Sequence, residues 1–291
     1  VINKILSSQL LLGDVCDISQ GIVTGLDKVS RKHMKVKQNE GFKYGDGCYV
    51  ISEDERKNYF SESNKHIKPW FKNSDIDMFK CNIKPSKWLI YSTREYDIHS
   101  NDEIKKHLLR FEPIIKMRNY DSGELKKAKR ENKWWALSSS RVGFDFSRPK
   151  IVVPQRSYVN KFAYNEVDWY ASADVYFISE KNNNKDIVKT ILGILNSKLI
   201  YLWLFKMGKR KGNYLELYLT PLSNIPLIST KNETILKIVK KILKAKDRLE
   251  VKNLYESLNI ETYKMYGLTN KEIQAVERFY QDNHANLGNN I

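Results

Sequence analysis

Two stretches, PKIVVP at residues 149–154 and ADVYFIS at residues 173–179, decide the fold of this chain. Both lack the strict alternation of apolar and polar side chains that marks a half-buried strand. Successive side chains of a strand point to opposite faces of a sheet, so both stretches predict central strands that are covered on both sides. Four runs with β-branched and aromatic residues predict further strands, at residues 47–52, 87–92, 134–137 and 161–165.

The last third of the chain carries helical patterns. Residues from about 186 to 206 are almost continuously apolar and predict one buried helix, and GKRKGN at 208–213 predicts a loop that ends it. Beyond residue 229, apolar residues at helical spacing predict a long amphipathic helix and then a second helix at about 252–265. The stripe of the first consists of Ile235, Ile238, Val239, Ile242, Leu243 and Leu249. Gly267 is the predicted cap of the second helix, and a further capping box runs from Thr269 to Glu272.

This order of elements is typical of an α+β fold. We expect a β-rich domain over residues 1–228, which includes the buried helix, and a C-terminal helical hairpin, or arm, over residues 229–291. The chain begins at Val1 without an initiator methionine, so we expect it to be a piece of a longer polypeptide.

The sequence contains none of the common catalytic motifs. It has no phosphate-binding GxxxxGK[ST] loop, no HExxH, no GxSxG and no pair of adjacent prolines. The three cysteines, Cys16, Cys48 and Cys81, lack the close Cys/His spacing of a metal site. We therefore predict no catalytic residue, no metal and no cofactor in this chain. An odd, scattered set of cysteines fits a reducing cytoplasm, and the absence of an apolar run of about 18–20 residues argues against a membrane partner.

Charge is the strongest functional indication. The 291 residues carry a net charge of +16, and half of this surplus lies between residues 116 and 161, where twelve Lys and Arg face four Asp and Glu. Lysines attract phosphates, whereas arginines can bind guanine edges with two hydrogen bonds. The predicted DNA-binding residues are Lys126, Lys129, Arg130, Arg141, Arg156, Ser157, Lys161, Lys209, Arg210 and Lys211. Two alternatives stay open: a solvated charged face, and pairing of Arg141 and Arg156 with acids that hold the fold together.

The segment KRENKWWALSSSR at residues 129–141 combines two tryptophans with cations and serines. If residues 134–137 form a strand, Trp134 and Trp135 point to opposite faces. We expect Trp135 to anchor the core and Trp134 to support the binding surface.

An ordered series of segments resembles a known family. The segments are DISQGIVTGLDKV (17–29), HIKPWFKNSDID (66–77), WLIY (88–91), the run from PIIKMRN to FSRPKIVVPQRS (113–157), ADVYFI to ILGILNSKLIYLWL (173–204), NIPL (224–227) and YKMYGLTNKEIQAVE (263–277). In this order they resemble the TaqI-like C-terminal specificity domain, the target-recognition domain of adenine-N6 DNA methyltransferases and of type IIG restriction–modification enzymes.

The resemblance implies a β-rich, double-β-helix-like lobe followed by a helical hairpin. It also implies recognition of a short sequence in duplex DNA next to an adenine-N6 methyltransferase domain, upstream in the same polypeptide or acting in trans. S-adenosylmethionine would belong to that domain, and this chain alone would not be an enzyme. The alternatives are a half-subunit similar to type I specificity subunits and a nonspecific basic RNA-binding or scaffold domain.

Overall fold

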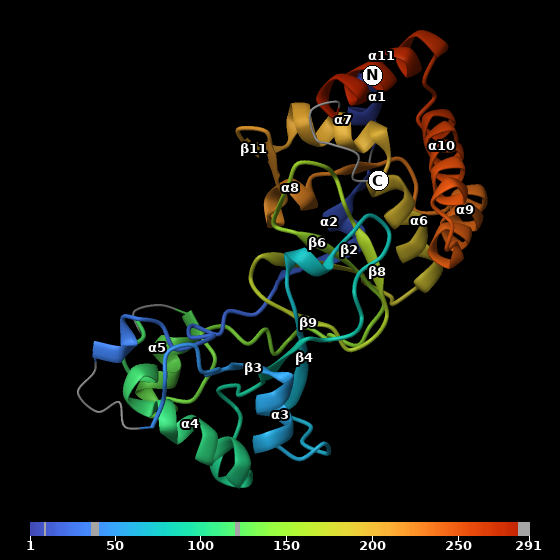
Figure 1. Cartoon of the computed structure of the whole chain (residues 1–291). Coiled ribbons are helices and arrows are strands. Elements are labelled where there is room, and N and C mark those ends of the chain that lie inside the picture. Colours follow the sequence, from blue (N-terminus) through green and yellow to red (C-terminus); the bar gives the residue numbers. More distant parts are fainter. Residues whose placement is uncertain (9, 36–40, 120–122, 285–291) are drawn as a thin grey trace.

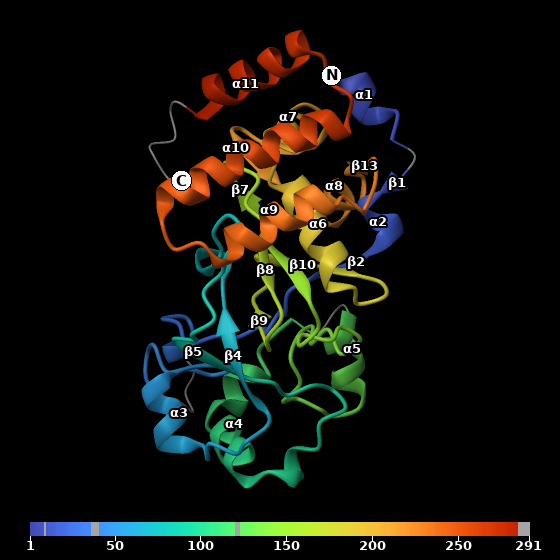
Figure 2. The same ribbon diagram turned by 90° about the vertical axis from the view of Figure 1, so that its right-hand side faces the viewer.

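The structure, a computed structural model, describes residues 1–8, 10–35, 41–119 and 123–284. Figures 1 and 2 show an upper and a lower lobe joined by a narrower waist. The upper lobe contains α1 (Ile2–Leu6), β1 (Leu10–Leu11), α2 (Leu12–Val15), β2 (Cys16–Gln20), β6 (Lys150–Pro154), β7 (Arg156–Ser157), β8 (Ala163–Asn165), β10 (Val175–Glu180), α6 (Lys185–Leu195), α7 (Lys198–Met207), β11 (Lys209–Lys211), β12 (Tyr214–Glu216), α8 (Leu219–Ser223), β13 (Pro226–Leu227), α9 (Glu233–Lys244), α10 (Arg248–Met265) and α11 (Asn270–His284).

The lower lobe holds a second sheet and its helices. Its elements are β3 (Val50–Ser52), α3 (Glu53–Tyr59), β4 (Ile67–Phe71), β5 (Lys87–Ile90), α4 (Asp102–Ile115), α5 (Gly123–Arg130) and β9 (Tyr170–Ala171). The strands pair in the order β3-β5-β4-β9, and only the β4–β9 pair is parallel. The mixture of helices with open sheets confirms the α+β class, whereas the double-β-helix-like lobe stays an expectation of the resemblance.

The central sheet has the antiparallel order β2-β10-β6-β8 and separates two hydrophobic cores. On β10, Tyr176 and Ile178 face the core of the upper lobe, whereas Val175 and Phe177 face that of the lower lobe. Every residue of β6 and β10 is buried, as the two opening stretches of the sequence predict. One face of this sheet therefore packs against the core of the upper lobe, and the other face packs against the core of the lower lobe.

The predicted single helix from about 186 to 206 is wrong in one respect. The segment forms two helices, α6 and α7, which meet at Asn196 and Ser197 and are bent by 67°. The Ser197 side chain accepts a hydrogen bond from the Ile200 amide, which starts the new helix. Among the described residues no single helix could span a membrane; only this bent pair, taken together, has the necessary length and apolar composition.

The C-terminal arm, defined as α9–α11, consists of three helices, whereas the expected hairpin has two. The capping box from Thr269 to Glu272 is confirmed and begins α11. In α9, Ile235, Val239 and Ile242 are buried as expected, but the helix ends at Lys244 and Leu249 is exposed on α10. A Cβ at Gly193 of α6 would lie 2.8 Å from side-chain atoms of both Ile235 and Val239, so glycine permits this close packing. The arm shares one core with α6 and α7. The division of the chain at 228/229 stays a prediction.

The predicted strand at residues 134–137 is also wrong. This segment is a series of turns, and the Arg118 guanidinium donates to the carbonyls of Trp134 (2.8 Å) and Ala136 (2.9 Å). The Trp135 indole N–H donates to the Tyr96 carbonyl at 3.0 Å. Both tryptophan rings are half-buried, and their planes are nearly perpendicular. Both pack against the core of the lower lobe, so Trp135 and Trp134 do not divide between core and surface as expected.

A strap, residues 76–82, crosses from the lower lobe to the upper lobe (Figure 2). Phe79 lies in the core of the upper lobe at a φ of 69°, with its ring 6.2 Å from that of Tyr255 in α10. The Phe79 amide donates to the Phe162 carbonyl at 2.8 Å. Lys80 Nζ donates at 2.5 Å to the carbonyl of Ala245, which is the C-cap residue of α9. A bulky residue at positive φ costs free energy and persists only where surrounding contacts hold its backbone. The contacts of Phe79 and Lys80 provide this support.

Candidate nucleic-acid interface

The basic segment 208–213 is a strand and a turn, not the predicted loop. Residues 209–211 form β11, which pairs with β12, and β12 pairs with β7. We call these three strands the basic sheet. The turn consists of Gly212, at a φ of 60°, and Asn213, a residue pair that favours a two-residue hairpin. The short hairpin therefore carries Lys209, Arg210 and Lys211 outward from the end of α7.

The register of the basic sheet brings a carboxylate between two of the predicted cations. Glu216 lies opposite Lys209 on one side and opposite Arg156 on the other. Its Oε1 accepts from Arg156 Nε at 3.2 Å, and its Oε2 lies 3.4 Å from Lys209 Nζ. The Glu216 side chain is 7% exposed, against 47% for Arg156 and 64% for Lys209. A buried acid thus anchors two exposed cations.

Tyr218 completes this cluster. Its hydroxyl accepts from Arg156 Nη2 at 2.7 Å and donates to Glu216 Oε1 at 3.1 Å. Its ring lies 5.9 Å from the Arg156 guanidinium and 5.3 Å from Lys209 Nζ, within cation–π range. Burial opposes ionisation of Glu216, but the hydrogen bonds from Tyr218 and Lys209 outweigh it, so the pKa of Glu216 lies below its usual value. The carboxylate is therefore charged at neutral pH.

The other residues of the basic sheet present aromatic and cationic surface. The rings of Tyr158 and Tyr214 lie 3.8 Å apart, and each residue is 40% exposed. Arg210 lies over the ring of Phe205 at 4.0 Å, and Lys211 is exposed. Such a mixture of aromatic faces and cations is suited to a polyanion with flat, stackable groups.

Arg141 lies at the waist and is fixed differently from Arg156. Its Nε donates to the Gly21 carbonyl at 3.2 Å, and its Nη2 donates to Gln20 Oε1 at 2.9 Å. Gln20 is directly opposite Tyr176 in the central sheet, and the Tyr176 ring is 6.3 Å from that of Tyr218. The contacts of Arg141 thus hold the chain where it leaves the central sheet.

The cations of α5 lie in the other lobe. Lys126, Lys129 and Arg130 are exposed on one helix, which buries Leu125 and Ala128 against the lower lobe. The Glu124 carboxylate of this helix accepts from the amide (3.0 Å) and hydroxyl (2.8 Å) of Ser140 and from the Ser139 hydroxyl (3.1 Å). The hydroxyl groups of both serines are therefore bound to an acid.

Two further predicted residues have local partners. Ser157 is buried, and its hydroxyl accepts from the Val159 amide at 3.3 Å. Lys161 is half-buried, with its Nζ 4.0 Å from Asp77 of the strap. Neither side chain is as exposed as the cations of the basic sheet.

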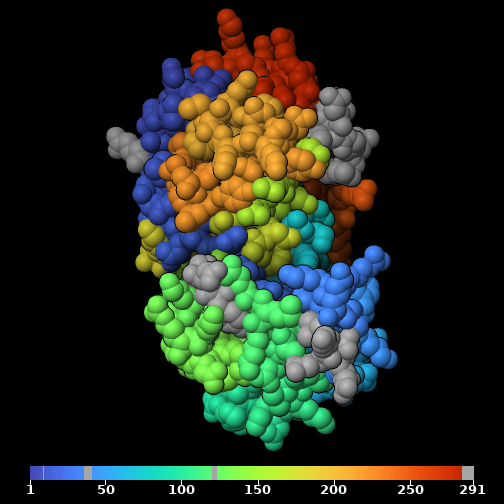
Figure 3. All heavy atoms as spheres, turned by 90° about the vertical axis from the view of Figure 1, so that its left-hand side faces the viewer, coloured from blue at the N-terminus to red at the C-terminus, as the bar shows by residue number. Residues whose placement is uncertain are grey.

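Figure 3 faces the side of the molecule on which the segment of α7, β11 and β12, in orange, lies above and the segment of α5, in green, lies below. Figure 1 shows the same arrangement in profile, with β11 and α5 on the left side of their respective lobes. The cations of the basic sheet and those of α5 thus form two groups, one in each lobe, on the same side. They do not form one continuous cluster.

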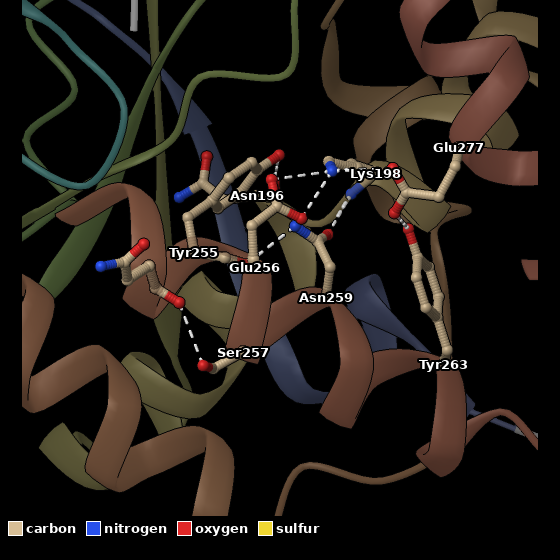
Figure 4. Close-up of polar contacts among 9 residues, drawn as sticks. Asn196, Lys198, Tyr255, Glu256, Ser257, Asn259, Tyr263 and Glu277 are labelled. Carbon is tan, nitrogen blue, oxygen red and sulfur yellow. Dashed lines mark hydrogen bonds and ion pairs between the residues drawn. The ribbon is translucent and has the colours of Figure 1, made fainter. Parts of the chain in front are cut away.

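A second charged cluster of the upper lobe is centred on a nearly buried lysine. Lys198, at the start of α7, is 8% exposed, and its Nζ lies 2.8 Å from a carboxylate oxygen of both Glu256 on α10 and Glu277 on α11 (Figure 4). The Tyr263 hydroxyl donates to Glu277 at 2.7 Å, and the Asn259 side chain accepts from the Lys198 amide at 2.8 Å. Burial opposes the charge of Lys198, but the two acids outweigh it, so its pKa is raised.

The sequence alone does not identify Glu216 and Tyr218, which hold Arg156 and Lys209 in place. It also does not identify the tyrosine pair, Tyr158 and Tyr214. The turn-forming pair Gly212-Asn213, between KRK and YLE, was the available indication of a hairpin. In the part of the chain that the structure describes, no group of three or more His, Cys, Asp or Glu residues could hold a metal ion.

Comparison with known proteins gives a family match over residues 56–227, to the model described as the TaqI-like C-terminal specificity domain. The range includes α5, Arg141, Arg156 and the basic sheet. It corresponds to more than half of the chain.

Two curated relatives are Type II methyltransferases from Haemophilus influenzae. M.HindII is 30% identical over 225 residues, which are 74% of this chain and 38% of M.HindII. M.HincII is 35% identical over 100 residues, which are 32% of this chain and 20% of M.HincII. The chain therefore spans little more than a third of M.HindII. Among solved structures, the Type IIL restriction–modification enzyme MmeI in complex with DNA matches with a TM-score of 0.61 at 14% identity, over 95% of this chain and 37% of MmeI.

Proposed function

Because the chain belongs to the family of TaqI-like C-terminal specificity domains, we propose that it recognises a specific sequence in duplex DNA and positions an adenine-N6 methyltransferase on it. Family membership supports a target-recognition role in restriction–modification. Duplex DNA as ligand and the adenine-N6 chemistry of the partner are the proposed steps beyond it. The catalytic part, with its S-adenosylmethionine, would be a separate domain, and the place of action would be the cytoplasm.

The observation that carries the proposal is the cluster of Arg156, Glu216 and Lys209. Two exposed cations are held on a rigid sheet by one buried carboxylate, so the cluster keeps an excess positive charge. Arg210 and Lys211 on the same sheet add to this excess, and α5 adds a second group on the same side of the molecule. Two separated groups of cations suit the repeating phosphates of a long polyanion, since a small anion could contact only one of them.

The experiment is selection from a random duplex library with the full-length protein that contains this chain, followed by binding measurements on the enriched sequence. We expect one short sequence to be enriched and bound at least about 1,000-fold more tightly than unrelated duplexes. Mapping of methylated adenines on plasmid DNA should identify the same sequence. Equal binding to all duplexes, or preference for RNA, would overturn the proposal in favour of a nonspecific basic domain.

The arrangement with the methyltransferase is tested in the same preparation. If the catalytic domain is fused upstream, the purified single polypeptide methylates DNA. A subunit that resembles type I specificity proteins would instead require a separate methyltransferase chain, which co-purification and reconstitution would detect.

A further inference from the structure

Arg156 is the best-oriented cation of the basic sheet. Its Nε donates to Glu216, and its Nη2 donates to the hydroxyl of Tyr218. Within the described residues, Nη1 makes no hydrogen bond, so its two N–H groups remain available on a guanidinium that is fixed at its other edge. A guanidinium held in this way loses little conformational entropy when it binds.

Arg210, on the neighbouring strand, is oriented less strictly. Its guanidinium lies over the Phe205 ring, and its only hydrogen bond in the described structure is a long one, 3.5 Å, to the Gly212 carbonyl. In the part of the chain that the structure describes, no carboxylate pairs with Arg210. An arginine that can turn about its side chain follows a phosphate backbone well but discriminates poorly between bases. The same small sheet thus contains one fixed and one loosely held arginine.

We propose that Glu216 is a positioning residue that presents Arg156 to the edge of a guanine in the major groove of the target DNA. Guanine exposes two acceptors there, O6 and N7, and no donor, which matches an arginine end that offers only N–H groups. Lys209, Arg210 and Lys211 contact phosphates beside it. This inference rests on the proposed function and adds a base contact to it.

The test uses the full-length protein and its selected target sequence, together with duplexes that carry each single base-pair change. In R156K the charge stays and the fixed fork is lost. We expect binding to the target to fall about 10- to 100-fold, and discrimination to disappear at one G·C pair only. In E216Q the same pair should lose discrimination to a smaller degree, about fivefold, because Arg156 is still present but less fixed.

Two matched variants serve as controls. R210K changes an arginine of the same sheet that no carboxylate holds, so it should weaken all duplexes alike. E261Q removes a carboxylate that pairs with a lysine on α10 and should leave the discrimination pattern unchanged. Thermal unfolding of each variant separates a defect in folding from a defect in DNA binding.

The outcomes distinguish the inference from the proposed function. If the parent protein selects no sequence, the proposed function fails. If it does, but folded R156K and E216Q weaken all duplexes equally, Arg156 is a phosphate contact and only the inference is wrong. If E216Q shifts the thermal midpoint yet leaves every discrimination ratio unchanged, Glu216 is purely structural, which also overturns it.

Discussion

Two charged clusters of the upper lobe have opposite compositions. At the junction of α7 with the arm, one cation, Lys198, lies between two carboxylates, those of Glu256 and Glu277. On the basic sheet, one carboxylate, Glu216, lies between two cations, those of Arg156 and Lys209. In each case the central residue is nearly buried and its partners are more exposed.

The difference lies in the charge that remains. The Lys198 cluster is negative by one unit, and both acids are in contact with the lysine, so nothing in it attracts DNA. The Glu216 cluster is positive by one unit, and its two cations keep 47% and 64% of their side-chain surface exposed to solvent. One cluster therefore joins three helices, whereas the other keeps cations in place for a ligand. Ion pairs of similar geometry serve different purposes according to which charge is in excess.

The largest effect should follow from K198M, which retains the apolar stem and removes the charge. Glu256 and Glu277 would then repel each other beside a buried site. We expect a loss of about 2–3 kcal/mol in the free energy of unfolding, at the low end for a broken buried pair because Glu256 is half-exposed. Urea denaturation measures it.

K264M is the matched control, since Lys264 pairs with Glu261 on the exposed face of α10. Its loss should stay below about 1 kcal/mol. An equally large loss for K264M, or none for K198M, would contradict the assignment of the Lys198 cluster to stability.

The next effect concerns the salt dependence of DNA binding. Neutralising Lys209, Arg210 and Lys211 together should weaken binding to all duplexes by at least about tenfold at low salt, with little change in unfolding. The slope of log K against log salt should become shallower by up to about 0.9 for each phosphate that the variant no longer binds. Titrations at several salt concentrations determine the slope. A slope identical to that of the parent protein would show that the basic sheet is not part of the DNA-binding surface.

The smallest effect is the pH dependence of the two clusters. Lys198 has a raised pKa, so its contribution to stability is complete below the ordinary value of 10.5 and is lost as pH rises through the raised value. Glu216 has a lowered pKa, so its contribution is complete above the ordinary value of 4.5 and is lost as pH falls through the lowered value.

Urea midpoints of the parent, K198M and E216Q test this pH dependence. Above pH 6 the K198M difference should shrink only in alkali, and below pH 9 the E216Q difference should shrink only in acid. Any change of either difference between about pH 6 and pH 9 would argue against these partners.

The sequence predicts the central sheet well, because burial on both faces leaves a continuous apolar run in β6 and β10. It predicts the apolar face of α9 for a similar reason. The bend between α6 and α7 escapes prediction, because the apolar pattern continues through Asn196 and Ser197. These two residues turn the chain by hydrogen bonds to partners that lie far away in sequence, such as Asn160 and Phe162.

The candidate interface is predicted only in part. A basic composition indicates which segments are cationic, but not which cations are held or exposed. Ser139 and Ser140, for example, donate hydrogen bonds to Glu124. Trp134 and Trp135 lie in turns that Arg118 stabilises, because contacts between distant segments override local β propensity. The Glu216 cluster depends on the register of three short strands. The turn at Gly212-Asn213 indicates the β11–β12 hairpin, but no local pattern specifies the pairing of β12 with the distant β7.

The strap also determines how this protein can be re-engineered. The chain leaves the central sheet after β2 and returns with β6, so most of the lower lobe is one insertion, and β9 joins it from a later segment, between β8 and β10. Such an insertion, with the matching β9 segment, invites transplantation between relatives as a cassette. Phe79 and Lys80 belong to that cassette in sequence, yet they dock onto α9 and α10 of the recipient. A chimera should therefore keep the recipient's residues 76–82 or also import the matching arm. Otherwise Phe79 and Lys80 of the graft would lack their contact residues on α9 and α10.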